Sequence, residues 1–217
     1  MRQPSSAPFE RAKQMSKIVV QEFITLDGVI QAPGGTDEDR DSGFEHGGWT
    51  AQFDEAPGGE EIGPFIADWE SRTEALILGR KTYDIWASYW PFADATEEGF
   101  MGDLVRTYNR VPKYVASRTR PELSWTNSRL LDPDLATDVA NLRAEDAGEI
   151  RIWGSANLVK SLAEHNLIDE YRLAVYPLVL GTGKKLFSDG FPVSALTLVD
   201  STPLSSGVVV NILRPAV

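Results

Sequence analysis

The chain has 217 residues, of which 42% are hydrophobic, so it can bury one ordinary core and we expect a single domain. A formal charge of -11 argues against nucleic-acid binding, which needs a concentrated basic surface, and the absence of cysteine excludes disulfides and thiolate chemistry. Two histidines offer no His-rich metal centre and no apolar run approaches the ~20 residues of a membrane span, so we expect a cytoplasmic protein without metal or membrane contact.

The start of the chain is polar and contains two prolines, which predicts a flexible extension over residues 1–15 ahead of a domain over residues 16–217. An apolar run then predicts a first strand at 18–26, which ends at the turn-forming pair Asp27-Gly28. Residues 33–61 are rich in glycine and acidic residues, yet they contain several large aromatic side chains. This composition favours an ordered flap over a site, with ordinary surface packing as the alternative.

Helix-like and strand-like spacings of apolar residues alternate through the rest of the chain. Helices are predicted at 62–69, 81–88, 97–109, 132–142 and 158–166, and strands at 75–78, 111–117, 150–153, 171–177, 195–199 and 208–213. We expect Phe100, Met101, Leu104, Val105 and Tyr108 to face inward, and Trp69, Trp86 and Trp90 to belong to the core. This order predicts an α/β domain whose mostly parallel sheet ends in an antiparallel pair of strands.

One stretch, residues 149–187, holds a strand, a small-residue turn, a helix and a second strand in succession. The turn Gly154-Ser155-Ala156-Asn157 lets backbone N–H groups approach a ligand at the start of a helix, as anion-binding turns do. The alternative interpretation is a purely structural βαβ unit, because short glycine-rich turns are weak signals.

Four predicted strand ends carry glycine, hydroxyl or arginine side chains. Ligands bind outside the carboxyl ends of such strands, and Arg80, Lys81, Arg118 and Arg120 form a local cationic set there in an otherwise acidic protein. Guanidinium groups grip phosphate through paired hydrogen bonds, so a polyphosphate ligand is the natural inference. Neither GxxxxGK[ST] nor GxGxxG is present, which argues against a P-loop and against a standard Rossmann site.

Several segments together resemble the dihydrofolate-reductase-like superfamily. They are LDGVI at 26–30, LILGRKTYD at 76–84, VASRT at 115–119, WGSANLVKSL at 153–162 and LIDEYRLAVYPLVLGTGKKLF at 167–187. More narrowly, the chain is similar to the reductase domain of the bifunctional riboflavin-biosynthesis deaminase-reductase and to its stand-alone relatives. The resemblance implies a three-layer α/β/α fold, a homodimer, and NADPH as cofactor.

The resemblance also assigns cofactor-binding residues, because the GRKT-like turn, the SRT-like turn and the glycine-rich helix start hold NADPH in that superfamily. Carried over, these residues are Gly79, Arg80, Lys81, Thr82, Ser117, Arg118, Gly154, Ser155, Ala156, Asn157 and Leu158. Arg80 and Arg118 suit a 2′-phosphate, which favours NADPH over NADH.

The chain departs from the family pattern at two positions. Dihydrofolate reductases have a pterin-binding acid on the helix before the GRKT-like turn, where this chain has Gly63, and they have Gly-Gly where this chain has Gly154-Ser155. The zinc deaminase half of the bifunctional enzyme is absent. Dihydrofolate reduction is therefore not expected, and the cations that a ribose phosphate would need are not apparent.

Candidate catalytic residues are Asp27, His46 and Tyr176. Asp27 follows a strand end and could bind or protonate a substrate, or it could simply form the turn before Gly28. His46 could protonate an acceptor, although an exposed loop histidine is more often a solvated bystander, and Tyr176 either lines the cleft or packs in the core. On the substrate side we expect Asp27, Trp49 and Phe65.

These observations predict an NADPH-dependent oxidoreductase that reduces a small pteridine-like, heterocyclic or carbonyl substrate by hydride transfer. Two alternatives remain open: a non-catalytic NADPH- or nucleotide-binding module of the same fold, and the aminopyrimidine reductase of the riboflavin pathway.

Overall fold

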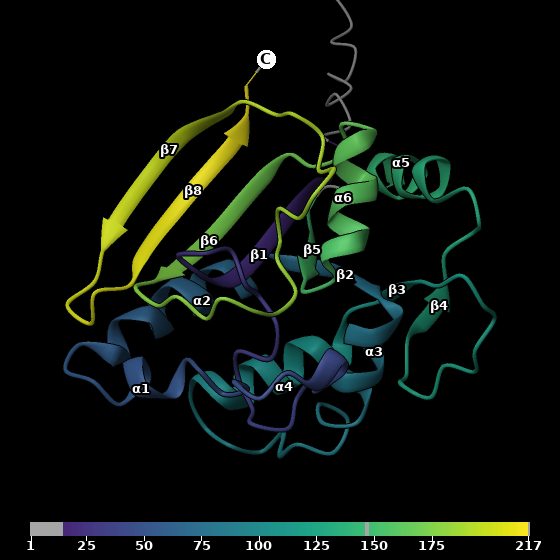
Figure 1. Cartoon of the computed structure of the whole chain (residues 1–217). Helices are drawn as coiled ribbons and strands as arrows, with labels where there is room; N and C mark the ends of the chain where they lie inside the picture. Colours follow the sequence, from purple (N-terminus) through teal and green to yellow (C-terminus); the bar gives the residue numbers. More distant parts are fainter. Residues whose placement is uncertain (1–14, 146–147, 217) are drawn as a thin grey trace, which may run out of the picture.

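The fold is a three-layer α/β/α sandwich around one eight-stranded sheet, in a computed structural model that describes residues 15–145 and 148–216 (Figure 1). The sheet order is β4-β3-β2-β5-β1-β6-β8-β7. The strands are β1 (Lys17–Thr25), β2 (Thr73–Gly79), β3 (Lys113–Ala116), β4 (Ser128–Leu130), β5 (Glu149–Trp153), β6 (Glu170–Tyr176), β7 (Leu196–Pro203) and β8 (Val209–Pro215). The pairs among β1 to β6 are parallel, whereas β8 pairs antiparallel with both β6 and β7. The predicted fold class is therefore confirmed.

The central strands are buried on both faces, as expected for a parallel sheet covered by helices. Ile18, Val19 and Val20 of β1 have no exposed surface, and Leu76, Ile77 and Leu78 of β2 are equally buried. The six parallel strands, β1 to β6, end at the same edge of the sheet, which brings the turns after β1, β2, β3 and β5 together.

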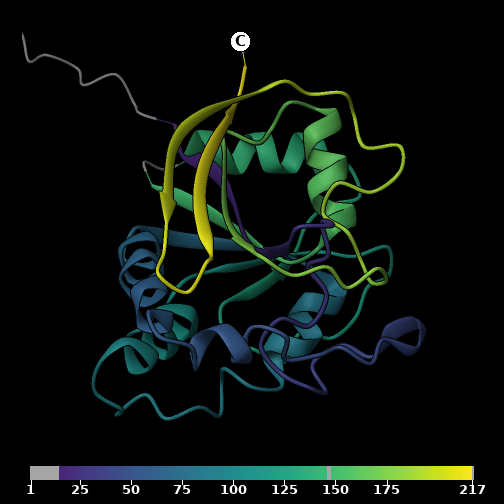
Figure 2. The same cartoon turned by 60° about the vertical axis from the view of Figure 1, so that its left-hand side comes forward.

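Helices cover both faces of the sheet (Figures 1 and 2). On one face lie α1 (Ala51–Asp54), α2 (Ile62–Glu70), α3 (Arg80–Ala87) and α4 (Phe100–Arg110), and on the other lie α5 (Leu135–Glu145) and α6 (Ala156–Glu164). Ile66, Trp69 and Tyr108 belong to the first core, whereas Val139 and Leu162 belong to the second. Helices α2, α5 and α6 therefore bury the apolar stripe that the sequence predicts for them.

The sequence predicts the C-terminal end of α6 correctly but assigns the wrong residue to the N-terminal cap of α5. Asn166 adopts a left-handed conformation (φ 54) directly after α6, which confirms it as the stop residue. Asp132-Pro133 was expected to cap α5, but the cap is Asp134, whose carboxylate accepts the Thr137 backbone N–H at 3.2 Å. The carboxylate that lies closest to the free N–H groups of the first turn makes this bond.

The structure differs from the sequence prediction at two other places. Strand β4 was not predicted, because three residues carry no periodicity. Phe100 and Met101 were expected to face inward but are 36% and 37% exposed.

The expected extension lies almost wholly outside the described residues. In the described part of the chain, no helix combines the length and the apolar character needed to cross a membrane. The homodimer remains a prediction, and β7 carries the exposed apolar residues Leu198 and Val199 at the edge of the sheet.

Candidate functional site

A long cleft runs along the carboxyl ends of the parallel strands. Its volume is about 2590 Å³, well above the ~300–1,000 Å³ typical of pockets for drug-sized molecules, so a dinucleotide and a second molecule fit together. All eleven residues that the sequence assigns to the cofactor line it: Gly79, Arg80, Lys81, Thr82, Ser117, Arg118, Gly154, Ser155, Ala156, Asn157 and Leu158. The structure thus brings three separate turns into one place, which we call the cationic half of the cleft.

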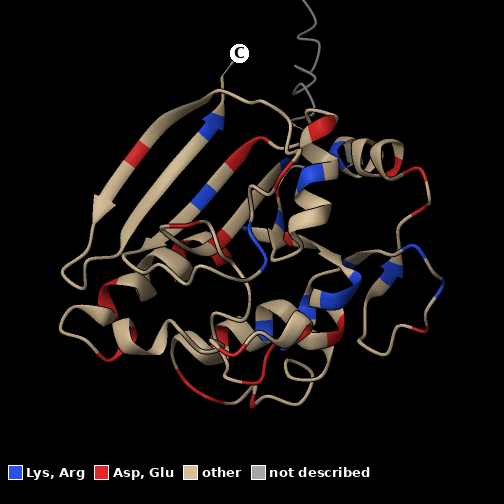
Figure 3. Ribbon diagram, viewed as in Figure 1, with Lys and Arg blue, Asp and Glu red and all other residues tan. Residues whose placement is uncertain are grey.

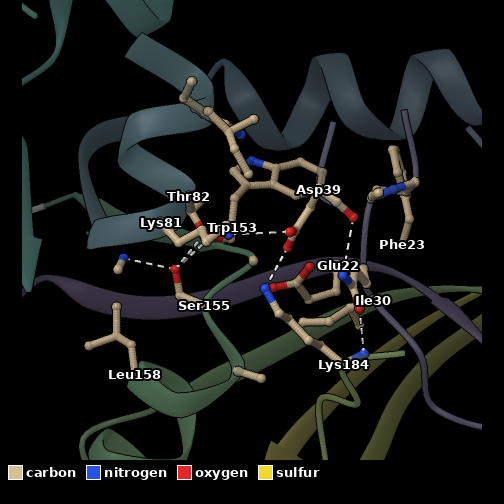
Figure 4. Close-up of a pocket in the computed structure, with 18 of the residues that line it drawn as sticks. Glu22, Phe23, Ile30, Asp39, Lys81, Thr82, Trp153, Ser155, Leu158 and Lys184 are labelled. Atoms are coloured by element: carbon tan, nitrogen blue, oxygen red, sulfur yellow. Dashed lines mark hydrogen bonds and ion pairs between the residues drawn. The ribbon is translucent and has the colours of Figure 1, made fainter. Parts of the chain in front are cut away.

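The starts of α3 and α6 meet at the centre of the cationic half (Figure 4). Ser155 Oγ accepts the Gly79 backbone N–H at 2.8 Å and lies 2.8 Å from Thr82 Oγ1, so the two helix starts are hydrogen-bonded to each other. Gly154 (φ 60) and Ser155 (φ 65) are successive left-handed residues just before α6. Successive backbone N–H groups in such turns form a concave donor array that suits an anion.

Arginine and lysine side chains border these helix starts. In Figure 3 they colour the beginning of α3 and the loop after β3 blue. Arg80 pairs with Asp84 one turn further along α3, at 2.7 Å. Arg118 is exposed and forms no ion pair with any other described residue, which leaves its guanidinium available to a ligand.

Lys81 is held by two carboxylates from the 33–61 segment. It pairs with Asp41 and, at 3.6 Å, with Asp39, and Lys184 pairs with the same two carboxylates at 2.7 and 2.6 Å (Figure 4). Hydrogen bonds that Lys184 and Lys81 donate to Asp41 lower the pKa of its carboxyl to about 2. The bond that Lys81 donates to Asp41 also raises the pKa of Lys81. The 33–61 segment therefore lies over the cleft as an ordered flap, and its own aromatic residues Phe44 and Trp49 are buried against the rest of the protein.

Glu22 is a cleft residue that the sequence interpretation missed. It lies in the middle of β1, is 3% exposed, lines the cleft, and its Oε1 has no hydrogen-bond partner among the described residues. Burial raises its pKa well above the usual value, the Gly154 N–H opposes that rise, and the charge of Glu38 adds to it. The polar pair Gln21-Glu22 between the apolar runs of a central strand was the signal that could have identified it.

Replacing Glu22 by glutamine is expected to stabilise the protein at pH 8 and to leave its stability unchanged at pH 4. The unfolded glutamate ionises at about pH 4.3, whereas burial raises the pKa of Glu22 in the folded protein, so wild-type stability falls as the pH rises between the two pKa values. Each kcal/mol gained corresponds to about 2–4 °C in Tm for a chain of this size. Thermal melts from pH 4 to pH 9 measure this effect.

Glu164→Gln, on the exposed surface of α6, is the matched control for that experiment, and its melts should follow those of the wild type. An equal change in Tm for Glu22→Gln at pH 4 and pH 8 would contradict a raised pKa of Glu22.

The other end of the cleft is lined by aromatic side chains, and we call it the aromatic half. Phe23 packs edge-on against Trp153 (5.3 Å between ring centroids) and against Tyr176 (5.8 Å), and Trp86 lies 5.7 Å from Trp90 and 6.2 Å from Trp153. Trp69 is in the core as expected, but Trp86 and Trp90 line the cleft, which corrects their assignment.

Tyr176 is the one predicted catalytic residue that lines the cleft. Its hydroxyl makes no hydrogen bond with another described residue, and burial, with a smaller contribution from the charge of Asp54, raises its pKa. Asp54 lines the same part of the cleft, where partial burial raises its own pKa.

Asp27 and His46 do not line the cleft. The Asp27 carboxylate accepts the Leu180 and Gly181 backbone N–H groups at 3.2 and 2.9 Å and the Thr25 hydroxyl at 2.7 Å, so it forms a turn. These bonds lower its pKa against the opposing effect of desolvation. His46 is exposed and packs on the ring of Phe44 instead of a substrate site.

Trp49 and Phe65 also lie outside the cleft lining. Trp49 is buried, donates its indole N–H to the Gln31 carbonyl at 2.8 Å and supports Tyr176 from behind, with ring centroids 5.2 Å apart. Phe65 packs on Trp69 in the core. Trp49 of the flap and Phe65 of α2 therefore pack against other residues of the protein and do not face the cleft. Within the described ranges, no cluster of three His, Asp or Glu side chains is arranged to hold a metal ion.

Comparison with known proteins agrees with this geometry. The chain is 29% identical to the uncharacterized protein YyaP of Bacillus subtilis (strain 168) over 198 residues, which cover 89% of this chain and 92% of YyaP. Among solved structures, a proposed riboflavin biosynthesis protein from Shewanella sp. PV-4 superposes with a TM-score of 0.62 at 19% identity, covering 93% of this chain and 99% of that one. A dihydrofolate reductase from Enterococcus faecalis complexed with NADP(H) superposes with a TM-score of 0.55 at 11% identity, covering 93% and 97%.

The model of the RibD C-terminal domain matches residues 16–210, nearly the whole of the chain that folds into the sandwich. With its dihydrofolate-reductase-like fold and its cleft at the carboxyl ends of the strands, the chain belongs to the RibD C-terminal domain family.

Proposed function

We propose that this protein is an NADPH-dependent reductase that transfers hydride within the cleft to a small heterocyclic or carbonyl substrate. The family and the reductase-like fold support a reductase in general terms. The observation that carries the proposal is the convergence of two helix starts and unpaired or exchangeable cations in the cationic half. Such a site matches the pyrophosphate and 2′-phosphate of NADPH in charge and in donor geometry.

The residues fit that cofactor on structural grounds. A side chain at Gly154 would place Cβ 2.9 Å from Thr82 Oγ1, and one at Gly79 would place it 2.7 Å from Ser155 Oγ, so only glycine allows the turns to approach this closely. The Gly154-Ser155 turn and the start of α6 would hold the pyrophosphate, while Arg80 and Arg118 would hold the 2′-phosphate.

NADPH would supply the hydride, and the chain would position the substrate and provide a proton. Hydride addition to a C=N or C=O carbon forms a C–H bond, and a proton completes the N–H or O–H bond as NADP⁺ is released. Glu22 and Tyr176 line the cleft, and burial raises the pKa of both, which favours their protonated forms and makes them the candidate proton donors.

The first test is selective cofactor binding, followed by nicotinamide fluorescence. We expect saturable NADPH binding that weakens at least 100-fold in Arg80→Ala combined with Arg118→Ala, since each charge-assisted hydrogen bond contributes about 1.5–3 kcal/mol. NADH, which lacks the 2′-phosphate, should bind more weakly and change by less than threefold. Arg106→Ala, an exposed arginine on α4 outside the cleft lining, is the matched control. Equal binding of the two cofactors would contradict the assignment.

A non-catalytic binder is the second candidate, and Gly63 is the observation in its favour. This residue lines the cleft where dihydrofolate reductases have an acid, and a Cβ built on it would meet no atom within 4 Å. Asp54 and Glu60 line the same region and could take the place of that acid. Stoichiometric NADPH oxidation with any member of a pterin, flavin, quinone and aldehyde panel would exclude a binder.

A further inference from the structure

Charge is divided unevenly along the cleft. The described lining contains five basic side chains, which are Arg80, Lys81, Arg118, Lys184 and Lys185. The first three belong to the cationic half. Lys184 is paired with Asp39 and Asp41, and Lys185 lies 3.8 Å from Asp27. None of the five belongs to the aromatic half.

The aromatic half forms a continuous wall of rings. From β6 toward α4, Tyr176, Phe23, Trp153, Trp86 and Trp90 contact one another in sequence, with centroid separations between 5.3 and 6.2 Å. Ile62, Ile66, Met101 and Leu104 complete the lining from α2 and α4. Planar ring faces and aliphatic side chains stabilise a flat aromatic ligand by stacking and burial.

The charges that do reach the aromatic half are negative. Asp54 lies near the Tyr176 hydroxyl, and Glu60 lines the cleft one turn before α2. Arg151, the arginine nearest in the chain to Trp153, is fully buried and bonds Glu149 and the Trp69 carbonyl, so it faces no ligand. A phosphate placed here would meet like charge without a cationic partner, which costs binding energy.

We propose that the substrate is a planar heteroaromatic molecule, neutral or cationic, that carries no phosphate group. The inference rests on the proposed function, because it assigns the aromatic half to the molecule that receives the hydride. It distinguishes this chain from a reductase that acts on an aminopyrimidine ribose phosphate, because the phosphate of such a substrate needs cations in the aromatic half. Tyr176 and Asp54 would instead contact ring nitrogen or amino groups.

The test compares heterocycles with and without a phosphate ester. Riboflavin and FMN share one ring system, and pyridoxine and pyridoxine 5′-phosphate share a smaller one. Binding is followed by quenching of tryptophan fluorescence, with saturating NADP⁺ present so that the phosphate esters cannot occupy the cationic half. At least one unphosphorylated ring should bind, and its phosphate ester should bind at least tenfold more weakly. Equal or tighter binding of the ester, or no binding by either ring, would overturn the proposal.

A charge-insertion variant tests the cause of the discrimination. Ala67 is an exposed, cleft-lining residue of α2, so Ala67→Lys adds a cation without disturbing the core. It should tighten binding of the phosphate ester and narrow the tenfold difference to about threefold or less, whereas Ala67→Gln should leave it unchanged. An identical response of the two variants would contradict a charge-based exclusion.

Two experimental outcomes distinguish the proposed function from the proposed substrate class. Failure of NADPH to bind, measured without any heterocycle, counts against the proposed function. Tight binding of a phosphate ester with NADPH binding intact removes only the proposed substrate class.

Discussion

Glu149→Ala is expected to lower the free energy of unfolding by about 3–5 kcal/mol, the usual cost of breaking a buried ion pair by removing one partner. Glu149 Oε1 and Oε2 accept from Arg172 at 2.7 and 2.9 Å, and Oε2 also accepts from Arg151 at 2.7 Å. Arg151 is fully buried and already has one nitrogen without a hydrogen-bond partner among the described residues, and the loss of Glu149 removes the carboxylate that accepts its hydrogen bond. Urea denaturation at pH 7 measures the change.

The Glu149 carboxylate also makes the stability of the wild-type protein depend on pH, and the Glu149→Ala variant lacks this dependence. Burial raises the Glu149 pKa, but the hydrogen bond and charge of Arg172, with the charge of Arg151, outweigh it, so the net pKa is lowered. A lowered pKa stabilises the fold above the unfolded value of about 4.3, and this contribution is lost as the pH falls through the folded value. Wild-type stability should therefore decrease below pH 5 more steeply than that of Glu149→Ala.

Asp68→Ala is the control, because Asp68 forms an exposed pair with Arg72 that should contribute less than about 1 kcal/mol. Similar losses for the two variants would mean that burial of the Glu149 network is energetically unimportant.

Gly154→Ala is expected to weaken NADPH binding by about 10- to 100-fold while the protein remains folded. The left-handed backbone (φ 60) costs about 1–2 kcal/mol for alanine, and the new Cβ would lie 2.9 Å from Thr82 Oγ1. Relief of that contact separates Thr82 from Ser155 and disperses the donor array at the start of α6. NADPH titration alongside circular dichroism measures binding and folding together.

Gly63→Ala provides the matched comparison. Gly63 lies in helix α2 directly before Pro64, and a Cβ there meets no atom beyond its chain neighbours within 4 Å. Because a proline disfavours the helical conformation of a preceding residue that has a Cβ, the change should not stabilise the helix, but it should leave NADPH affinity intact. Unchanged affinity in Gly154→Ala would show that the turn does not hold the cofactor.

Much of the fold could be predicted because its signals are local. Helices α2 and α6 have apolar residues at helical spacing, and β2 is a continuous apolar run. Strand β4 has neither pattern, since its three residues are ordered only by pairing with β3. Phe100 and Met101 show a further limit, because an apolar stripe on a helix can border a cleft as well as a core.

The candidate site was predictable where residue chemistry alone is informative. Glycine, hydroxyl and arginine side chains at strand ends marked the cationic half, and the structure brings them together. The burial of Glu22 depends on residues that the tertiary structure packs around it. The role of Asp27 depends on the backbone N–H groups of Leu180 and Gly181, which lie more than 150 residues later in the chain.

The position of β1 has a consequence for the synthesis of the protein. This first strand pairs with β5 and β6 on its two sides, and its partner for Lys17 is Glu149, more than 130 residues later in the chain. At about 5–20 residues per second, the ribosome needs on the order of ten seconds to deliver that partner. Throughout this interval the apolar run Ile18-Val19-Val20 and the apolar pair Phe23-Ile24 of β1 lack both neighbouring strands, so nascent chains should depend on protection from aggregation until β6 emerges.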